Sequence, residues 1–281
     1  MSIVFLNDEY VALENAKVSA LDRGFTFADA VYEVIPVYGG AIFRLEEHLQ
    51  RLQRSLDSIG IANPYDEGLW SSIFSSVLKR NPTDGDCSLY VQVSRGVSER
   101  DHLNDQDLKP TVFVMAREFQ QRDWVEGVKV ITHKDIRWEY CHIKSTALLA
   151  NVMLKQLARA EEAKEAILFK NGLLKEGASS NVFIVKDNVV STPAKDESIL
   201  PGITRDLLIE LMQDSDIVCE QRDITEEEFE LADEIWISSS TMGLAPVVMV
   251  NDRTVGDGQP GELWKKANDL FREFRENRIT L

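Results

Sequence analysis

Short apolar runs closed by tight turns recur along the chain and restrict its possible folds more than any other feature. The pairs Asn171-Gly172 and Asp187-Asn188 each separate two β-like runs, and such pairs favour hairpin turns. Other segments carry apolar residues every three or four positions, which predicts amphipathic helices. Hairpins mixed with helices predict an α+β fold rather than a regularly alternating, doubly wound sheet.

These two periodicities predict the individual elements. Strands are expected at residues 3–6, 10–13, 32–38, 41–43, 87–94, 111–116, 128–133, 166–169, 182–185 and 235–238. Helices are expected at residues 45–59, 67–79, 146–163, 204–212 and 262–277. The apolar face of the third helix is expected to consist of Leu149, Val152, Met153, Leu157 and Ala160.

A polar stretch with little periodicity interrupts the chain at residues 117–123. We therefore predict a domain at residues 1–116, a linker at 117–123 and a larger domain at 124–281. The length of 281 residues allows each domain to bury its own core.

The charge balance and the cysteines restrict the partners of the chain. With 47 acidic against 31 basic residues the net charge is −16, which repels phosphate backbones and makes nucleic acid an unexpected partner. The three cysteines lie far apart, without the spacing of a metal site or a disulfide framework. Without a signal peptide or an 18-residue apolar run, we expect a cytoplasmic protein that does not bind membranes.

Several common catalytic motifs are missing from the sequence. It has no phosphate-binding loop, no glycine-rich dinucleotide motif, no paired-histidine zinc motif and no serine-hydrolase elbow. Only two of its four histidines, His133 and His142, lie near one another, so no metal site is expected.

Lys144 is the first candidate for catalysis. Residues 137–145 read Arg-Trp-Glu-Tyr-Cys-His-Ile-Lys-Ser, and the lysine stands directly before the helix expected from residue 146. The positive end of a helix dipole disfavours an ammonium and favours a free amine, the form that condenses with a carbonyl. This argument favours a lysine that forms a Schiff base; the alternative is a surface lysine beside a helix.

Three further stretches combine small, hydroxyl and charged residues. Residues 200–205 precede a helix, whose free backbone N–H groups favour an anion, although an ordinary N-cap at Thr204 is the alternative. Residues 175–181 place a carboxylate beside hydroxyl groups after a hairpin, and residues 237–243 form a hydroxyl cluster after an apolar strand. Each is also compatible with a plain polar loop.

Taken together and in this order, these stretches resemble the fold type IV enzymes that use pyridoxal 5′-phosphate (PLP). The resemblance includes Asp-Arg-Gly-Phe at residues 22–25, Asp-Ala-Val-Tyr-Glu at 29–33 and Glu-His-Leu-Gln-Arg-Leu at 47–52. Ala28 and Ala30 stand where glycines are usual in the family. The resemblance implies PLP as cofactor and two domains, a small α/β domain and a larger pseudo-barrel α/β domain.

The resemblance also implies roles for individual residues. Lys144 is expected to carry the cofactor as a Schiff base and to move the proton at the substrate Cα. Glu176 is expected to pair with the pyridine nitrogen, and Arg51 with the phosphate. The other expected cofactor-binding residues are Ser180, Asn181, Ile203, Thr204, Ser239 and Ser240.

Within this class the sequence is most similar to the D-amino acid aminotransferases. Asp-Ile-Arg-Trp at residues 135–138 precedes the lysine, and Tyr32, Arg100 and His102 match the residues that bind the substrate carboxylate. In the family the arginine and histidine reach in from the neighbouring subunit, so a homodimer with shared active sites is expected. The implied reaction is ping-pong transamination between a D-amino acid such as D-alanine and a 2-oxo acid such as 2-oxoglutarate, giving pyruvate and D-glutamate.

Other members of the class remain as alternatives. An L-branched-chain aminotransferase would share Lys144 and Glu176 but would not use Arg100 and His102 to hold a carboxylate. An aminodeoxychorismate lyase would release pyruvate without needing an amino acid. A non-catalytic protein that kept the fold would have no need of the lysine, acid and phosphate signals together.

Overall fold

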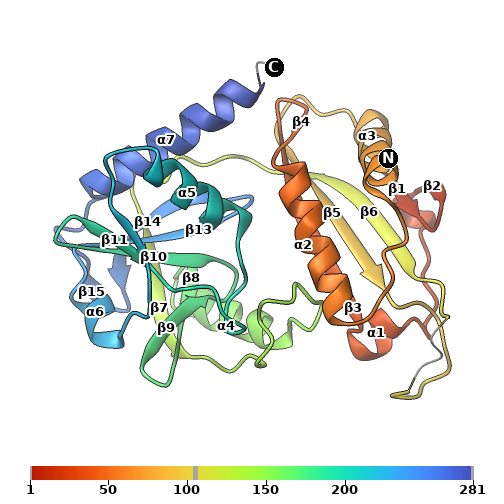
Figure 1. The fold of residues 1–281 in the computed structure, drawn as a ribbon, viewed down its shortest axis with the longest axis horizontal. Coiled ribbons are helices and arrows are strands. Elements are labelled where there is room, and N and C mark those ends of the chain that lie inside the picture. Colours follow the sequence, from red (N-terminus) through yellow and green to blue (C-terminus); the bar gives the residue numbers. More distant parts are fainter. Residues whose placement is uncertain (1, 104–106, 280–281) are drawn as a thin grey trace. The chain divides into compact units, whose positions relative to one another are not determined.

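The computed structural model describes residues 2–103 and 107–279 (Figure 1). These residues divide into two compact units. The first extends to Gln121 and also contains Ile143–Ala147, whereas the second contains Arg122–His142 and the described residues from Leu148 onward. The boundaries predicted from the sequence stay a prediction, but the segment that contains Lys144 belongs to the first unit.

The first unit is built on a six-stranded antiparallel sheet with the order β2-β1-β6-β5-β3-β4 (Figure 1). Its elements are β1 (Ile3–Leu6), β2 (Glu9–Ala12), a 3-10 turn (Leu13–Asn15), α1 (Arg23–Phe27), β3 (Ala30–Tyr38), β4 (Ala41–Ile42), α2 (Leu45–Ser58), α3 (Glu67–Arg80), β5 (Cys87–Ser94) and β6 (Thr111–Glu118). The predicted strands at residues 3–6 and 87–94 coincide with β1 and β5. Strand β6 continues to Glu118, into the stretch predicted as a linker.

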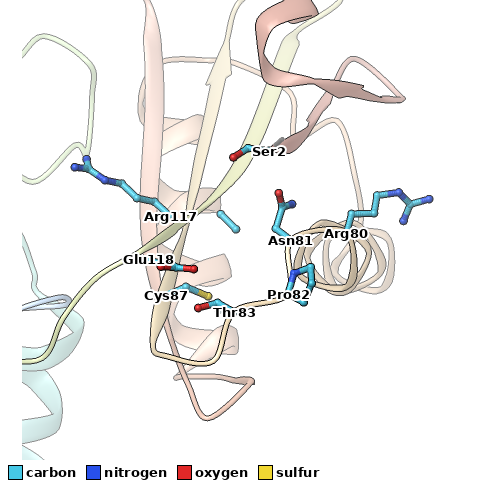
Figure 2. Close-up of a pocket in the computed structure, with 9 residues that line it drawn as sticks. Ser2, Arg80, Asn81, Pro82, Thr83, Cys87, Arg117 and Glu118 are labelled. Carbon is cyan, nitrogen blue, oxygen red and sulfur yellow. The ribbon is translucent and has the colours of Figure 1, made fainter.

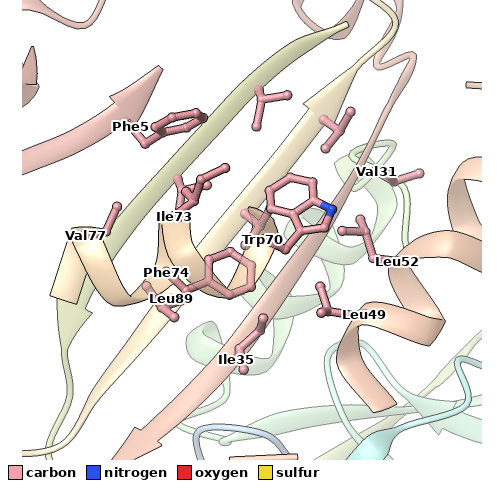
Figure 3. Packing of buried hydrophobic residues seen from close by; sticks show 14 of the residues in the cluster. Phe5, Val31, Ile35, Leu49, Leu52, Trp70, Ile73, Phe74, Val77 and Leu89 are labelled. Atoms are coloured by element: carbon pink, nitrogen blue, oxygen red, sulfur yellow. The ribbon is translucent and has the colours of Figure 1, made fainter. Parts of the chain in front are cut away.

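Helices α2 and α3 cover one face of this sheet with apolar side chains (Figure 3). Trp70 and Phe74 of α3 stack with their ring centroids 5.6 Å apart, and Leu52 of α2 packs into the same cluster as Ile35 of β3. Complete burial of each such side chain stabilises the fold by about 1.5–3 kcal/mol. Glu33 interrupts this pattern, because a fully buried carboxylate stands among the apolar residues of β3.

Ala28 ends α1 in the left-handed backbone conformation, with φ 55° and ψ 27°. This conformation costs an L-residue about 1–2 kcal/mol, and glycine avoids that cost while losing about 0.4–1 kcal/mol of chain entropy. Ala28→Gly is therefore expected to raise the free energy of unfolding by up to about 1 kcal/mol in denaturant titrations. Ala30→Gly is the control, because Ala30 is buried in a strand and the change should destabilise. A lower stability of Ala28→Gly would contradict this account.

The second unit contains a nine-stranded mixed sheet with the order β12-β11-β10-β13-β14-β7-β8-β9, and β15 pairs with β14 (Figure 1). Its elements are β7 (Val128–Lys134), α4 (Leu149–Ala160), β8 (Glu165–Lys170), β9 (Leu173–Gly177), β10 (Asn181–Lys186), β11 (Val189–Thr192), α5 (Ile203–Gln213), β12 (Cys219–Gln221), α6 (Glu226–Glu230), β13 (Glu234–Ser239), β14 (Gly243–Val250), β15 (Arg253–Thr254) and α7 (Glu262–Ile279). Among the described residues, no helix has the length and apolar character needed to cross a bilayer.

The sheet of the second unit must curl. Strand β9 lies at one edge and is five strand spacings from β10, which in a flat sheet is about 24 Å. Residues 178–180 alone connect the two strands, and such a connection spans at most about 15 Å. The two strand ends are therefore brought together by curvature of the sheet, which confirms the pseudo-barrel prediction.

Helix α4 begins later than the sequence predicts, and this removes the electrostatic argument for Lys144. The helix starts at Leu149 rather than at residue 146, so Lys144 does not stand at a helix N-terminus. Residues 144 and 145 are instead extended and pair with β3: the Tyr32 N–H donates to the Lys144 carbonyl oxygen at 2.9 Å, and Ser145 forms a bridge with Val31. The dipole argument is wrong because backbone pairing to the sheet, and not helix formation, decides the conformation here.

The predicted buried face of α4 is also wrong. The side chains that pack on the sheet are Leu154 and Ala158. Leu149 is 75% exposed, and Val152, Met153 and Leu157 are exposed as well. The helix is apolar on two sides, so periodicity could not tell which side faces the sheet of its own unit.

Candidate active site

Lys144 is held by its backbone against the edge of the first unit's sheet. Its N–H donates to the Ser55 hydroxyl at 3.3 Å, in addition to the bond that its carbonyl accepts from Tyr32. Its Nζ lies 4.2 Å from the centroid of the Tyr32 ring. In the part of the chain that the structure describes, this Nζ forms no hydrogen bond and no ion pair, so it is available to a bound group.

Arg51 is locked in place by a buried carboxylate. Its Nε and Nη2 donate to the two oxygens of Glu33, each at 2.8 Å, and His48 Nδ1 lies 2.8 Å from the same carboxylate. Burial opposes ionisation of Glu33, but the charge and hydrogen bonds of Arg51 and His48 outweigh it, so the pKa of Glu33 is far below its usual value. Burial lowers the pKa of His48 despite Glu33. The role of Arg51 in phosphate binding stays a prediction, but its guanidinium is oriented before any ligand arrives.

Glu33 and His48 carry no predicted role, although the sequence holds a signal for both. Glu33 is a charged residue within an otherwise apolar strand, on the same face as Val31 and Ile35. His48 and Arg51 are three residues apart in α2 and so share one face of the helix. The contact of Glu33 with His48 and Arg51 depends on how α2 packs on the sheet, so the sequence alone does not predict it.

The three predicted substrate-binding residues lie at two places in the first unit. Tyr32 stacks on Tyr90, with the ring centroids 5.9 Å apart, and lies beside Lys144. Arg100 and His102 both pack on Phe27, with the Arg100 Cζ 5.2 Å and the His102 ring 5.4 Å from the centroid of its ring. A guanidinium and an imidazole are thus gathered on one aromatic side chain.

Glu176 lies in the second unit, where three donors surround its carboxylate. Arg137 Nη1 donates at 2.5 Å, Asn181 Nδ2 at 3.1 Å and the Leu200 N–H at 3.1 Å. The side chain is buried, and burial raises the pKa of Glu176 to about 7, against the charge of Arg137 and the Leu200 hydrogen bond, which favour the ionised form. Asp135 fixes Arg137 through its Nε and Nη2, at 3.0 and 2.8 Å. A cation bound beside Glu176 would therefore favour its ionised form.

The start of α5 offers backbone donors to an anion. Gly202 is the N-cap and provides no side-chain cap, so the first N–H groups at Ile203 and Thr204 lack such a partner. A Cβ at position 202 would lie 2.0 Å from Asn181 Oδ1, so only glycine fits. Asn181 pairs across the sheet with Ser238, whose buried hydroxyl has no hydrogen-bond partner within the described residues. This donor set suits a phosphate group.

The remaining predicted cofactor residues differ in their surroundings. The Ser180 hydroxyl donates to Glu165 at 3.0 Å, so this contact already engages it. Ser239 ends β13, and Ser240 follows it in the turn that leads to β14. Ser238 belongs to the hydroxyl cluster predicted at residues 237–243 but was not among the expected cofactor-binding residues; its buried hydroxyl has no hydrogen-bond partner within the described residues.

The first unit contains a cavity of about 510 Å³ (Figure 2). It opens near Cys87 at the start of β5, whereas Tyr32 pairs with Gln92 five residues further along that strand. Figure 2 shows the guanidinium groups of Arg80 and Arg117 pointing away from the cavity. None of the predicted site residues lines it.

Comparison with known proteins decides the family. A family model described as amino-transferase class IV matches residues 30–250. The chain is a class IV aminotransferase. The aminotransferase is 38% identical over 271 residues to the D-alanine aminotransferase of Bacillus licheniformis, covering 96% of this chain and 95% of that protein.

Solved structures similar to this aminotransferase include branched-chain aminotransferases. The enzyme of Thermoproteus uzoniensis with norvaline has a TM-score of 0.89 and 27% identity, covering 99% of this chain and 95% of that one. The T.th. branched-chain amino acid aminotransferase complexed with N-(5′-phosphopyridoxyl)-L-glutamate has a TM-score of 0.88 and 25% identity, with coverage of 99% and 95%. The match over nearly the whole chain confirms the fold type IV prediction.

The aminotransferase uses pyridoxal 5′-phosphate, and its residues fit this group. Lys144 Nζ has the chemistry to bind an aldehyde, and the uncapped start of α5 has the donors for a phosphate. The buried carboxylate of Glu176 suits a protonated ring nitrogen. Contacts within its own unit hold each of these groups in place without the cofactor.

Proposed function

We propose that this aminotransferase transfers the amino group of a D-amino acid, such as D-alanine, to a 2-oxo acid, such as 2-oxoglutarate. The products are pyruvate and D-glutamate. The similarity to D-alanine aminotransferases over nearly the full chain supports this specificity. The observation that carries the proposal is the gathering of Arg100 and His102 on Phe27, because an arginine and a histidine side by side suit a carboxylate.

Lys144 and Glu176 perform the chemistry in this proposal, and the other residues hold the cofactor. When bound, PLP accepts the electrons left at the substrate Cα. Lys144 Nζ binds the cofactor and then takes and returns the proton of the substrate Cα. The Glu176 carboxylate holds the proton on the ring nitrogen. Arg51, together with the Ile203 and Thr204 N–H groups, binds the phosphate, while Ser180, Asn181, Ser239 and Ser240 complete the cofactor contacts.

A panel of amino acids tests the proposal. With 2-oxoglutarate as acceptor, we expect the purified holoenzyme to release pyruvate from D-alanine at a kcat/KM at least about 100-fold above that for L-leucine, because a misplaced carboxylate loses an orienting contact worth about 3 kcal/mol. Turnover of the L-amino acid alone would refute D-specificity.

An L-branched-chain aminotransferase is the second candidate. Several similar solved structures carry that name, which is the observation in its favour. Such an enzyme would not need Arg100 or His102 for the carboxylate. Arg100→Ala therefore separates the candidates: a raised KM for the amino acid supports the first, and an unchanged KM supports the second.

We also propose that the enzyme is a homodimer whose subunits share active sites. The exposed side of α4, defined by Leu149, Val152, Met153 and Leu157, is an apolar stripe, and contiguous exposed apolar side chains mark association surfaces. A second copy of the chain is the partner that the resemblance implies. The cytoplasmic location stays a prediction.

Met153→Glu is expected to weaken the dimer at least about 100-fold, because an unpaired carboxylate would be buried at an apolar interface. Sedimentation velocity at micromolar concentration should then show a monomer in place of the wild-type dimer. Leu231→Glu is the matched control, because Leu231 is 60% exposed but lies outside α4. A monomeric wild type, or a dimeric Met153→Glu variant, would refute this surface.

A further inference from the structure

Arg23 is a buried arginine that connects two parts of the first unit. It begins α1, and only 4% of its surface is exposed. Its Nη1 donates to the Asp101 carbonyl oxygen at 2.7 Å, and its Nη2 to the His102 carbonyl oxygen at 3.2 Å. Two of its donors are therefore bonded to the backbone of the segment that carries Arg100 and His102.

Asp29 holds the other side of the same guanidinium. Arg23 Nε donates to Asp29 Oδ2 at 2.9 Å, and Arg95 donates to the same carboxylate at 2.7 and 3.0 Å. Burial opposes ionisation of Asp29, but the hydrogen bonds from Arg95 and Arg23 outweigh it and lower its pKa. The ionised carboxylate thus fixes the direction in which Arg23 presents its two remaining donors.

The backbone reinforces this arrangement. The Arg23 N–H donates to the Gly96 carbonyl oxygen at 2.8 Å, and Asp22 forms a bridge with Val97. A Cβ at Gly24 would lie 2.9 Å from both Asp22 Oδ1 and the Ser94 Cβ, so the close approach of the two segments requires glycine. The stretch that leads into residues 100–102 is therefore packed directly on the start of α1.

Phe27 completes the support on the side-chain side. Arg23 Cζ lies 4.7 Å from the centroid of this ring, and Arg100 and His102 pack on the same ring. Helix α1 thus contacts residues 100–102 twice, through Arg23 on their carbonyl groups and through Phe27 on their side chains. A segment held in this way loses little conformational freedom when it binds a ligand.

We propose that Arg23 is a positioning residue for substrate specificity: it fixes the backbone of residues 101–102 so that Arg100 and His102 are oriented to receive the substrate carboxylate. The inference deepens the proposed function and rests on the carboxylate-binding role of those two residues. Lysine cannot replace Arg23, because one ammonium cannot reach a carboxylate and two carbonyl groups with the fixed geometry of a guanidinium.

Arg23→Lys tests this role by steady-state kinetics of the holoenzyme. We expect KM for D-alanine to rise about tenfold with kcat changed less than about threefold, the pattern produced by loss of ground-state binding. Arg80→Lys is the matched control, because Arg80 lies in the same unit but contacts the Tyr10 ring and the Ser76 carbonyl oxygen rather than residues 101–102. It should leave KM within about twofold of the wild type. Equal KM values for Arg23→Lys and the wild type would overturn the proposal.

A double-mutant comparison shows whether Arg23 acts through Arg100 and His102. In an Arg100→Ala/His102→Ala background, Arg23→Lys is expected to raise KM no further, because residues that act as one unit are not additive. The same tenfold rise in both backgrounds would mean that Arg23 acts elsewhere. If Arg100→Ala/His102→Ala itself leaves KM unchanged, the carboxylate-binding function fails first; if it raises KM and Arg23→Lys does not, only the positioning role fails.

Hydrogen exchange gives a readout that does not depend on turnover. In holoenzyme carrying Arg23→Lys, peptides covering residues 97–103 should exchange at least about threefold faster than in the wild type, while those of β5 should not change. Unchanged exchange at residues 97–103 would overturn the anchoring. If Arg23→Lys does not fold, Phe27→Leu removes the aromatic support instead and should give the same rise in KM; an unchanged KM in that variant would also count against the proposal.

Discussion

Replacement of Lys144 by alanine is expected to lower kcat/KM by at least about 10³-fold, the range attributed to a positioned acid–base group. Lys144 Nζ is held beside the Tyr32 ring with no hydrogen bond or ion pair among the described residues, so no other group competes for it. Transamination of D-alanine measures the loss. The added mass of the cofactor after borohydride reduction, located by peptide mapping, identifies the lysine that carries it.

Lys109→Ala is the control for this experiment. Lys109 is a largely exposed lysine of the same unit that pairs with Asp8 at the surface. The control should keep wild-type turnover and should still carry the cofactor on Lys144 after reduction. A cofactor mass on another lysine of the wild type, or on none, would remove the basis of the proposed mechanism.

Glu176→Gln is expected to lower kcat by about 100-fold, as for other removals of a preorganised electrostatic partner at a reacting group. Glutamine keeps the size of the side chain but cannot carry the negative charge that holds a proton on the ring nitrogen. The fold should persist, because Arg137 keeps its two hydrogen bonds to Asp135. Single-turnover measurements with D-alanine separate this loss from weaker cofactor binding.

Glu139→Gln provides the comparison for Glu176, because Glu139 is an exposed carboxylate of the same unit that pairs with Lys170. Its kcat should match the wild type within about twofold. If Glu176→Gln retained full turnover, the pairing of this carboxylate with the ring nitrogen would be refuted, although the lysine chemistry would be untouched.

The predicted start and the predicted buried face of α4 are both wrong, and they show that sequence periodicity cannot predict a helix with two apolar faces. Helices α2 and α3 have one apolar face each, and their predicted and observed bounds agree to within one residue at each end. Helix α4 has two apolar faces. The face with Leu154 and Ala158 packs on the sheet of its own unit, whereas the larger apolar stripe defined above stays exposed. The unused stripe is the surface that we assign to a second subunit.

Strand β14 was not among the predicted elements, although it pairs with both β13 and β7 in the second unit's sheet. Pro246 lies within it, and proline inside a run argues against a central strand because it lacks a donor. The two neighbouring strands tolerate the proline. On the β13 side Trp236 pairs opposite Pro246, and on the β7 side the parallel pairing begins only at Val247. No property of the local sequence contains this information.

The sequence alone determined the class of the enzyme, the α+β fold and most element bounds, because turn pairs, periodicity and ordered motifs are encoded within short stretches. Tertiary structure alone decided which partner each buried charged side chain has. Arg51 pairs with Glu33, Glu176 pairs with Arg137, and Arg23 donates to the carbonyl groups of residues 101 and 102. The partners of the first two pairs are 18 and 39 residues apart in the chain, and Arg23 is 78 and 79 residues from its two carbonyl groups. Whether a charged side chain finds a partner depends on which strands and helices pack together, and burial then makes that pairing obligatory.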